Sequence, residues 1–260
     1  MQKHLKASEE GAAKDVSHSS VSRVRPRAPQ SHAAAAPMDD FVRISVVREG
    51  ERARARFGDG EPPVGGLSKR LFDICFAAAA LVALAPLLAL IAVLVRLDSP
   101  GQSIFRQERG GFNGRSFRIW KFRTMRVMEN RGVVQARRGD ARITPLGEFL
   151  RRASLDELPQ LFNVLMGDMS IIGPRPHALE HDIQFERVDQ RYPQRQRARP
   201  GLTGLAQVNG CRGPTETEDK IVARTSYDVE YVRNWSWVRE FEILAGTFVV
   251  LLWKHDPGAL

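Results

Sequence analysis

Residues 71–98 read "LFDICFAAAALVALAPLLALIAVLVRLD", and this stretch decides how the chain is organised. Between Asp73 and Arg96 lie 22 consecutive residues without a charged side chain. A straight helix of that length measures about 33 Å, enough to cross the hydrocarbon core of a bilayer. Pro86 stands near the middle of the stretch, where it removes a backbone hydrogen bond and predicts a kink.

Basic residues flank the apolar stretch on both sides. Lys69 and Arg70 precede it, and Arg96 closes it. Further basic residues follow: Arg106, Arg109, Arg115, Arg118, Lys121 and Arg123. Because basic residues favour the cytoplasmic side, a spanning helix has to send one cluster across the membrane, whereas a re-entrant helix keeps both inside. The charges favour a re-entrant helix over residues 67–98, with a kinked span as the alternative.

The composition points to an acidic partner. The 260 residues carry a net charge of +9 and a pI near 10.1, which suits nucleic acid, anionic lipid or phosphorylated small molecules. No helix-turn-helix, zinc-finger or RNP-like motif accompanies the charge, so an anionic membrane surface is favoured over nucleic acid. The two cysteines, Cys75 and Cys211, suggest neither a disulfide scaffold nor a zinc site and fit a reducing, cytoplasmic setting.

The N-terminal part lacks the marks of a folded or targeting segment. The first twenty residues are polar and contain no apolar core of a signal peptide. Residues 1–66 are rich in Ala, Ser, Pro, Arg and Gly, and we predict a disordered N-terminal extension. The run "FVRISVVREG" at 41–50 could form a short strand, but no second strand is near.

The remaining residues, 99–260, predict a small cytoplasmic or interfacial catalytic domain of mainly helical α+β class. The runs "SIFRQERG" (103–110) and "RSFRIWKFRTM" (115–125) predict a β-hairpin. Helices are expected at about 145–153 and 156–166, and in the charge-rich segments 177–192 and 214–235. The C-terminal run "REFEILAGTFVVLLWKH" is too short to span a bilayer and suits an interfacial or core helix.

The adjacent acids Asp156 and Glu157 allow two interpretations. Ser154 and Glu157 fit a capping box, and Asp156 could itself be an N-cap. Alternatively, both carboxylates approach one Mg²⁺ or one phosphate–metal complex, since Mg²⁺ commonly takes one or two carboxylates plus substrate phosphates. Arg151 and Arg152 lie one turn upstream. The local pattern alone favours capping.

Basic residues elsewhere make the catalytic interpretation more attractive. Lys121 and Arg123 are two residues apart and so share one face of a strand. Arg175 stands between Pro174 and Pro176, which make it either a pre-organised anion donor or part of a rigid turn. No GxGxxG, P-loop, HExxH or DxD motif occurs, so ATPase, dehydrogenase, zinc protease and DxD-type glycosyltransferase functions lack support.

From about residue 67 to 252 the chain resembles the bacterial sugar transferases, the monotopic phosphoglycosyl transferases. The resemblance rests on blocks in family order: "KRLFD", the proline-broken helix, "IFRQERGGFNGRSFRIWKFRTM", "DARITPLGEFLRRASLDELPQLFNVLMGDMSIIGPRP", "RPGLTGLAQVNG" and "YDVEYVRNWSWVREFEIL". The chain departs in small ways, with Ala85 before Pro86 where some members have serine, and Glu240 where aspartate is frequent. The multi-helix bundle of larger members is missing from it.

The resemblance implies an enzyme of the cytoplasmic face of the bacterial inner membrane, with a re-entrant helix. Asp156 would be the nucleophile, and Glu157 would help to hold Mg²⁺ with it. Positions associated with substrate phosphates or the nucleotide match Lys121, Arg123, Arg151, Pro174, Arg175 and Pro176. The reaction would transfer a sugar 1-phosphate from a UDP-sugar to polyprenyl (undecaprenyl) phosphate, through a phosphosugar-aspartyl intermediate, with release of UMP.

Other classes of function remain to be weighed against this one. A catalytically degenerate membrane scaffold of polysaccharide assembly is the main alternative, and the intact acidic pair speaks against it. A membrane-tethered nucleic-acid binder is motivated by the pI alone. We therefore expect a UDP-sugar, polyprenyl phosphate and membrane lipid as partners and no nucleic acid, while a homodimer is left open. The sugar and the glycan pathway do not follow from the sequence.

Overall fold

The structure is a computed structural model that describes residues 62–126 and 139–253. Most of the predicted N-terminal extension, and the strand considered at 41–50, lie outside these residues. The described part has a mainly helical α+β fold, as predicted, with small sheets.

Seven α-helices are described, together with two pairs of strands and three short 3₁₀ helices. The α-helices are α2 (Gly66–Asp98), α3 (Pro145–Arg152), α4 (Gln160–Met166), α5 (Leu179–Val188), α6 (Leu205–Val208), α7 (Glu218–Arg233) and α8 (Trp237–Trp253). The strands are β1 (Ile104–Gly110), β2 (Ser116–Phe122), β3 (Ser170–Ile172) and β4 (Gly201–Thr203). The 3₁₀ helices are η1 (Phe112–Gly114), η2 (Leu155–Glu157) and η3 (Tyr192–Arg197).

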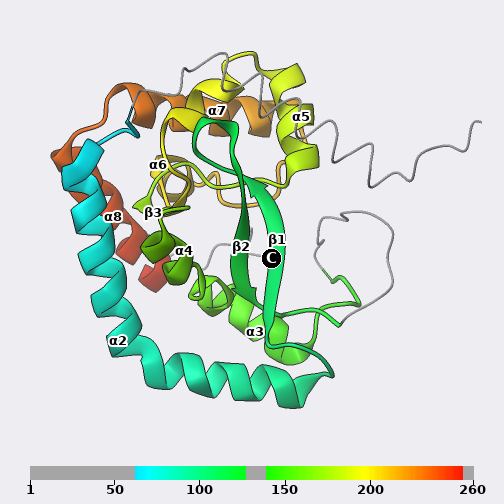
Figure 1. Ribbon diagram of the computed structural model, residues 1–260. Helices are drawn as coiled ribbons and strands as arrows, with labels where there is room; N and C mark the ends of the chain where they lie inside the picture. Colours follow the sequence, from blue (N-terminus) through cyan, green and yellow to red (C-terminus); the bar gives the residue numbers. More distant parts are fainter. Residues whose placement is uncertain (1–61, 127–138, 254–260) are drawn as a thin grey trace, which may run out of the picture. The chain divides into compact units, whose positions relative to one another are not determined.

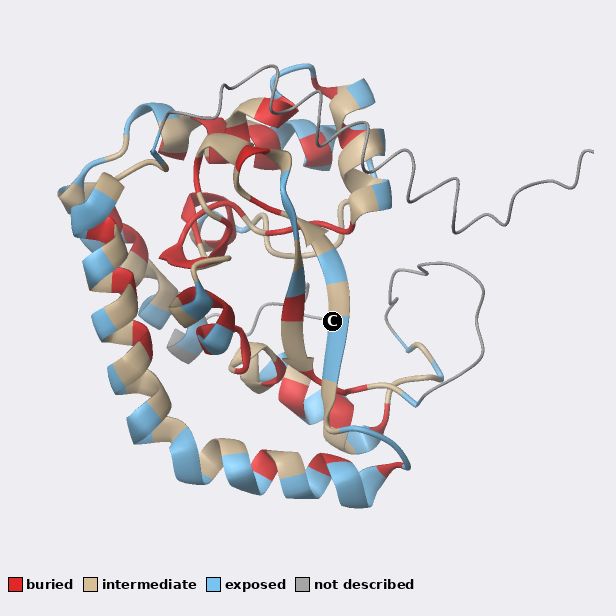
Figure 2. Ribbon diagram, in the orientation of Figure 1, coloured by how far each residue is buried: buried red, intermediate tan, exposed pale blue. Residues whose placement is uncertain are grey.

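The apolar stretch forms one continuous helix, α2, that changes direction part-way along (Figure 1). Pro86 is the proline inside it, and a proline is the usual cause of such a bend. By length and composition α2 could cross a membrane, and only 11% of its most apolar window is buried. Most of α2 is accordingly exposed or half-buried (Figure 2). The two arms of α2 diverge at an open angle (Figure 1), so the structure does not show the predicted re-entrant helix turning back on itself.

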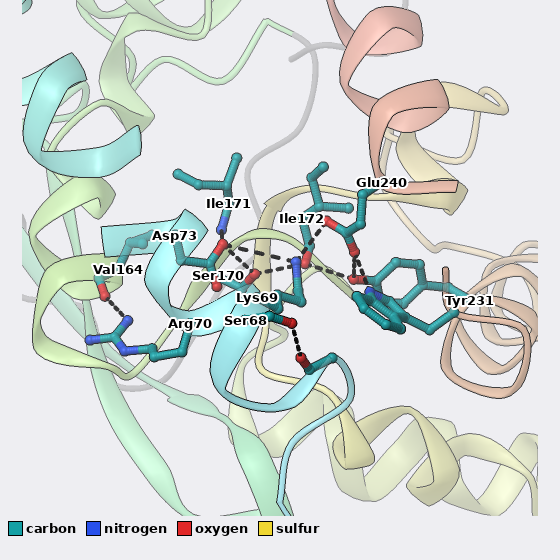
Figure 3. Close-up of polar contacts among 12 residues, drawn as sticks. Ser68, Lys69, Arg70, Asp73, Val164, Ser170, Ile171, Ile172, Tyr231 and Glu240 are labelled. Atoms are coloured by element: carbon teal, nitrogen blue, oxygen red, sulfur yellow. Dashed lines mark hydrogen bonds and ion pairs between the residues drawn. The ribbon is translucent and has the colours of Figure 1, made fainter. Parts of the chain in front are cut away.

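The first turns of α2 are fixed by a group of polar residues, all buried except the half-buried Trp235, which we call the anchor cluster: Lys69, Asp73, Ser170, Tyr231, Trp235 and Glu240. The Lys69 Nζ lies 2.7 Å from Glu240 Oε2, and both side chains are almost fully buried. Asp73 Oδ1 accepts from the Ser170 hydroxyl and the Ile171 N–H, each at 3.0 Å. Figure 3 shows how the cluster joins α2 to β3, α7 and α8.

The far end of α2 is fixed to the β-hairpin. The buried Arg123, just after β2, donates to the carbonyl oxygens of Val95, Ser99 and Pro100 at 2.6–3.1 Å. Carbonyls at a helix C-terminus lack intrahelical partners, so the guanidinium satisfies groups that would otherwise need water. Both ends of α2 are therefore bound to the same group of elements.

Strands β1 and β2 form the predicted antiparallel hairpin, in which Phe105 pairs with Lys121 and Arg109 with Phe117. Phe122 at the end of β2 packs with Ile91, Val95 and Leu150, beside α3. At the other end, Arg109 forms an isolated bridge with Ala178, next to α5. The hairpin therefore runs from α5 to α3 (Figure 1).

The main hydrophobic core lies around β3 and β4, which pair in parallel and were not predicted. Its buried members come from α2, β2, α4, β3, α6, α7 and α8, and from the loops before β3 and β4. They are Ala77, Ile119, Leu161, Val164, Met169, Ile171, Ile172, Ala198, Leu205, Tyr231 and Ile243. The segment after β3 carries "GPRP", and "GLAQ" follows β4 at the start of α6, so the core positions both.

The helix predicted over 156–166 is wrong in detail. The chain forms η2, and α4 then begins at Gln160 after an N-cap position occupied by Pro159. Ser154 makes no capping hydrogen bond and has a left-handed backbone with φ of 58°. Neither Ser154 nor Asp156 therefore caps a helix, and the capping interpretation of this segment does not hold.

Candidate active site

Asp156 lies in η2 and is 8% exposed. Within the residues that the structure describes, its carboxylate has no hydrogen bond and no ion pair. Burial, with a smaller contribution from the neighbouring Glu157, raises the pKa of Asp156 to about 6, although the charges of Lys121, Arg151 and Arg175 act to lower it. A buried carboxylate without a bound partner is costly to maintain, which makes Asp156 the first candidate for chemistry.

Glu157 has the opposite surroundings, although it is the next residue. Its Oε1 accepts from Lys121 Nζ at 2.7 Å and from Arg175 Nη2 at 2.6 Å, and its Oε2 accepts from Arg175 Nη1 at 3.1 Å. Burial opposes ionisation of Glu157, but Arg175 and Lys121 outweigh it and hold the pKa well below its usual value. Glu157 is therefore a charged, fixed group.

Lys121 reaches Glu157 because of strand register. In β2, Lys121 and Ile119 point to the same side, and the pairing places Phe105 and Gln107 of β1 beside them. Arg109 continues this face of β1 and donates to Gln107 Oε1 at 2.6 Å. Burial, and then the nearby Arg175, lower the pKa of Arg109 to about 10. The hairpin thus presents two cations, Lys121 and Arg109, on the side of the acidic pair.

Arg175 is held by its neighbours in the Pro174–Pro176 segment. Gly173 precedes it, and a Cβ there would lie 2.2 Å from the Arg199 carbonyl oxygen, so the close approach of the two loops needs glycine. The Pro174 carbonyl accepts from Gly201 N–H at 3.0 Å. Arg195 donates to the Arg175 carbonyl oxygen. These contacts fix the backbone around Arg175, and both interpretations drawn from the sequence, a pre-organised anion donor and a rigid turn, are compatible with them.

Behind Arg175 lies a buried polar network that was not predicted from the sequence. Arg195 Nε donates to Asp228 Oδ2 at 2.9 Å, and Arg224 Nη1 contacts His177 Nε2 at 3.1 Å. His177 Nδ1 lies 2.6 Å from the Tyr192 hydroxyl, which donates to Asp182. The members come from the loop after β3, α5, η3 and α7, and none forms a recognisable local motif.

The remaining predicted site residues divide into two groups. Arg151, in the last turn of α3, is half-buried and close enough to lower the pKa of Asp156. Arg123 instead uses its guanidinium on the C-terminal carbonyls of α2. The structure thus groups Lys121, Arg151 and Arg175 around Asp156 and Glu157, and commits Arg123 elsewhere. Substrate binding by Arg123 therefore stays a prediction from the sequence.

The acidic pair can be tested as a magnesium site. No group of three or more His, Cys, Asp or Glu side chains suited to a metal occurs in residues 62–126 and 139–253. One unpaired carboxylate beside a second one fits a Mg²⁺ ion that also takes substrate phosphates, because Mg²⁺ needs only one or two carboxylates there. An all-protein metal cage does not fit these residues.

Comparison with known proteins identifies the family. Residues 64–254 match the family described as bacterial sugar transferase. The UDP-glucose:undecaprenyl-phosphate glucose-1-phosphate transferase of Escherichia coli (strain K12) is 51% identical over 174 residues, which cover 66% of this chain and 38% of that protein. The chain thus matches about two fifths of the length of that larger relative.

Two other relatives are covered over more of their length. A protein of the same name from Caulobacter vibrioides is 50% identical over 72% of this chain and 70% of its own length. The exopolysaccharide production protein PSS of Rhizobium leguminosarum bv. phaseoli is 46% identical over 70% of this chain and 93% of its own length. The family match over residues 64–254 covers α2, the hairpin, the acidic pair and α8 alike. The chain therefore belongs to the bacterial sugar transferase family.

Proposed function

We propose that this protein transfers a sugar 1-phosphate from a UDP-sugar to undecaprenyl phosphate and so initiates exopolysaccharide synthesis. UDP-glucose is the first donor to test, because the relatives from E. coli and C. vibrioides are named for it. The observation that carries the proposal is the buried Asp156 carboxylate, which lacks a partner among the described residues while its neighbour Glu157 is held by two cations. Family membership supplies the reaction class.

Asp156 suits the role of nucleophile. Its Oδ would attack the β-phosphorus of the UDP-sugar, forming a carboxyl–phosphate bond while the bond between that phosphorus and the bridging oxygen breaks. UMP leaves with the bridging oxygen, and a phosphosugar-aspartyl intermediate remains. An oxygen of undecaprenyl phosphate then attacks the same phosphorus and releases Asp156. No proton has to be removed from Asp156 once it is ionised.

The cations around the acidic pair suit the substrate charges. Lys121, Arg151 and Arg175 lie where a diphosphate would meet Asp156, and Arg109 extends the row along β1. Fixed positive groups in a buried site stabilise charge that develops on phosphate oxygens during transfer. Glu157 keeps Lys121 and Arg175 in position between turnovers.

Magnesium is part of the proposal. Asp156 and Glu157 would hold the ion together with phosphate oxygens of the donor. When bound, Mg²⁺ neutralises diphosphate charge and so makes the β-phosphorus accessible to a carboxylate. Lys121, Arg151 and Arg175 would bind and orient the donor next to the ion.

We also propose that α2 enters the cytoplasmic leaflet of the inner membrane and returns to the same side. Support comes from its two ends, since the anchor cluster holds the first turns and Arg123 holds the last. A spanning helix would separate its ends by the thickness of the bilayer, which one small folded unit cannot bridge. The bend at Pro86 would mark the deepest point.

Aromatic and apolar surface residues support an interfacial location. Phe72 packs against Trp237 and Phe241, with ring centroids 5.6 and 6.3 Å apart. Tryptophans are enriched at the level of lipid head groups. Helix α8 buries Glu240 and Ile243 but exposes several large apolar side chains: Val238, Phe241, Phe248, Val249 and Leu251. Such a helix suits the membrane surface, and Asp156 would then work next to the lipid phosphate.

A purified-protein assay tests the reaction. With UDP-glucose, Mg²⁺ and undecaprenyl phosphate, we expect UMP and a lipid-linked glucose phosphate. Without the lipid, UMP should stop at one equivalent per enzyme, because the intermediate persists. Asp156→Asn should lower the rate of UMP release by a factor of about 10⁴ or more, as for other covalent nucleophiles. Asp219→Asn, at an exposed position, should release UMP at the wild-type rate. Wild-type protein that releases no UMP from any of a panel of UDP-sugars would favour the scaffold alternative.

Cysteine labelling in intact cells tests the topology. Single cysteines at Ser68 and Gln102, both exposed beside the ends of α2, are placed in a background without Cys75 and Cys211. A membrane-impermeant reagent added from outside should label neither position, and both should react after the cells are opened. Reaction of either one from outside would mean that α2 spans the membrane.

A further inference from the structure

The segment that presents Asp156 contains a backbone conformation that serine rarely adopts. Among the described residues, Ser154 and Asn113 are the non-glycine residues with positive φ, and Ser154 has φ of 58°. Such a conformation disfavours any side chain with a Cβ and persists where the surroundings impose it. Ser154 lies two residues before Asp156, so whatever holds this turn also sets the position of the nucleophile.

Local hydrogen bonds of the turn are few. The Ser154 N–H donates to the Arg151 carbonyl at 3.1 Å, and the Ser154 carbonyl accepts from Glu157 N–H at 3.3 Å. Both partners belong to the same short stretch, so they define the shape of the turn but do not attach it to the rest of the fold. The side-chain hydroxyl makes the distant contact: Arg212, 58 residues later, donates to Ser154 Oγ.

Arg212 is well placed to act as a tether because its two neighbours in the chain are themselves fixed. Cys211 N–H donates to the Ala206 carbonyl of α6 at 2.9 Å. The Gly213 carbonyl accepts from Arg224 of α7, a side chain that is 5% exposed. The loop that joins α6 to α7 is therefore bound on each side of Arg212.

We propose that Arg212 is a positioning residue, which holds the left-handed turn at Ser154 and thereby fixes Asp156 for attack on the donor. This inference rests on the proposed function. Arg212 acts through Ser154 and does not touch the reacting atoms. Arg224 supports it from α7, since that buried arginine bonds to both the loop at Gly213 and His177.

If Arg212 acts through Ser154, substitutions of the two residues should have the same effect on the reaction rate. Arg212→Ala and Ser154→Ala remove the two sides of one hydrogen bond, and both should lower kcat by about 10- to 100-fold with KM for UDP-glucose unchanged, because misplacing a reacting group by about 1 Å has effects of this size. The double variant should be no worse than either single one, since the pair acts as a unit. The exposed Arg187→Ala serves as control.

Ser154→Gly and Arg212→Lys separate positioning from general damage. Glycine adopts positive φ without a steric penalty, so Ser154→Gly should keep the turn and lose less than about fivefold of kcat. Arg212→Lys retains a donor for Ser154 Oγ and should recover most of the activity lost in Arg212→Ala. A structural defect alone would not be relieved by glycine, the more flexible residue.

A second readout does not depend on turnover. Amide hydrogen exchange over residues 153–158 should accelerate in Arg212→Ala and Ser154→Ala and stay slow in Arg212→Lys. A raised KM in Arg212→Ala with normal Ser154→Ala kinetics would overturn the proposal and make Arg212 a substrate ligand. Unchanged exchange and unchanged kcat in both alanine variants would overturn it as well. If wild type itself releases no UMP, the proposed function fails, and the exchange data still decide whether Arg212 holds the turn.

Discussion

The anchor cluster and the acidic pair are both buried groups of charged residues, and their carboxylates have different surroundings. In the anchor cluster, Glu240 accepts from Lys69, Tyr231 and Trp235 at 2.5–2.7 Å, and Asp73 accepts from Ser170 and Ile171. In the acidic pair, Glu157 is equally well bonded, whereas Asp156 has no partner among the described residues.

The difference in bonding distinguishes carboxylates that hold the fold together from a carboxylate that is available for a reaction. Burying a charge is tolerable when donors surround it, and then the group serves to fix elements in place. A carboxylate left without donors keeps its lone pairs available for phosphorus or a metal, at the expense of stability. Removing a partner of a bonded carboxylate should therefore lower the stability of the protein, whereas neutralising Asp156 should raise it, and the following predictions test this difference.

The largest stability loss is expected from breaking the anchor cluster. Lys69→Met leaves Glu240 buried without its cation and should lower the free energy of unfolding by about 3–5 kcal/mol, as for other broken buried pairs. Chemical denaturation in detergent measures it. Arg239→Met is the matched control, because it removes an ion pair with Glu230 that is only half-buried and reached by solvent, and solvent-accessible pairs contribute at most about 1 kcal/mol. A loss below 1 kcal/mol in Lys69→Met would remove the structural role assigned to the cluster.

A smaller loss is expected from the other end of α2. Arg123→Met removes hydrogen bonds to three carbonyl groups and should lower the free energy of unfolding by about 2–3 kcal/mol. KM for UDP-glucose should not change, since the guanidinium is committed to α2. An increase of tenfold or more in KM, with little loss of stability, would restore Arg123 to the phosphate-binding role predicted from the sequence.

Local sequence patterns were sufficient to predict most of the long helices, the β-hairpin and part of the candidate site. The length of the uncharged apolar run predicted α2, alternation predicted the hairpin, and a helical pattern predicted the charge-rich helices. Lys121, Arg175 and the acidic pair stood out through their neighbours in sequence. Strands β3 and β4, of three residues each, are too short to carry a pattern.

What the sequence could not reveal depends on distant partners. Asp73 and Ser170 are 97 residues apart, and Arg195 and Asp228 are 33 apart. No local spacing indicates that such residues meet. Ser154 was misread for a related reason: a glycine would have signalled positive φ, whereas serine before Glu157 resembles a cap. The hydrogen bonds of Arg123 were not foreseen, because its strand position was visible in the sequence but the carbonyl groups near the end of α2 were not.

In the acidic pair, two neighbouring substitutions should act in opposite directions. Asp156→Asn removes a buried charge that lacks a partner and should raise the free energy of unfolding by about 1–2 kcal/mol in magnesium-free buffer. Glu157→Gln should lower it, because Lys121 and Arg175 lose their counter-charge. Thermal unfolding of both variants in detergent compares them directly. Destabilisation by Asp156→Asn would mean that the carboxylate has a structural partner after all.

The smallest expected change in the free energy of unfolding comes from His177, a buried histidine that carries no charge. Burial lowers its pKa well below the usual value, and the facing cations Arg195, Arg224, Arg109 and Arg175 lower it further. Its other neighbours are Tyr192 and Asp182, whose carboxylate lies 3.9 Å from Nδ1.

The sign of the pH dependence follows from this environment. The unfolded chain binds a proton at His177 below about pH 6.5, and the folded protein does not, so stability is present above that pH and is lost on acidification. Each pH unit below 6.5 should remove about 1.4 kcal/mol through this residue. His177→Gln keeps an acceptor for Arg224 but cannot bind a proton. Between pH 7.5 and 5.5 it should therefore lose about 1.4 kcal/mol less than wild type, as measured by urea denaturation at both pH values. Equal losses in the two proteins would show that His177 takes up its proton in the folded state.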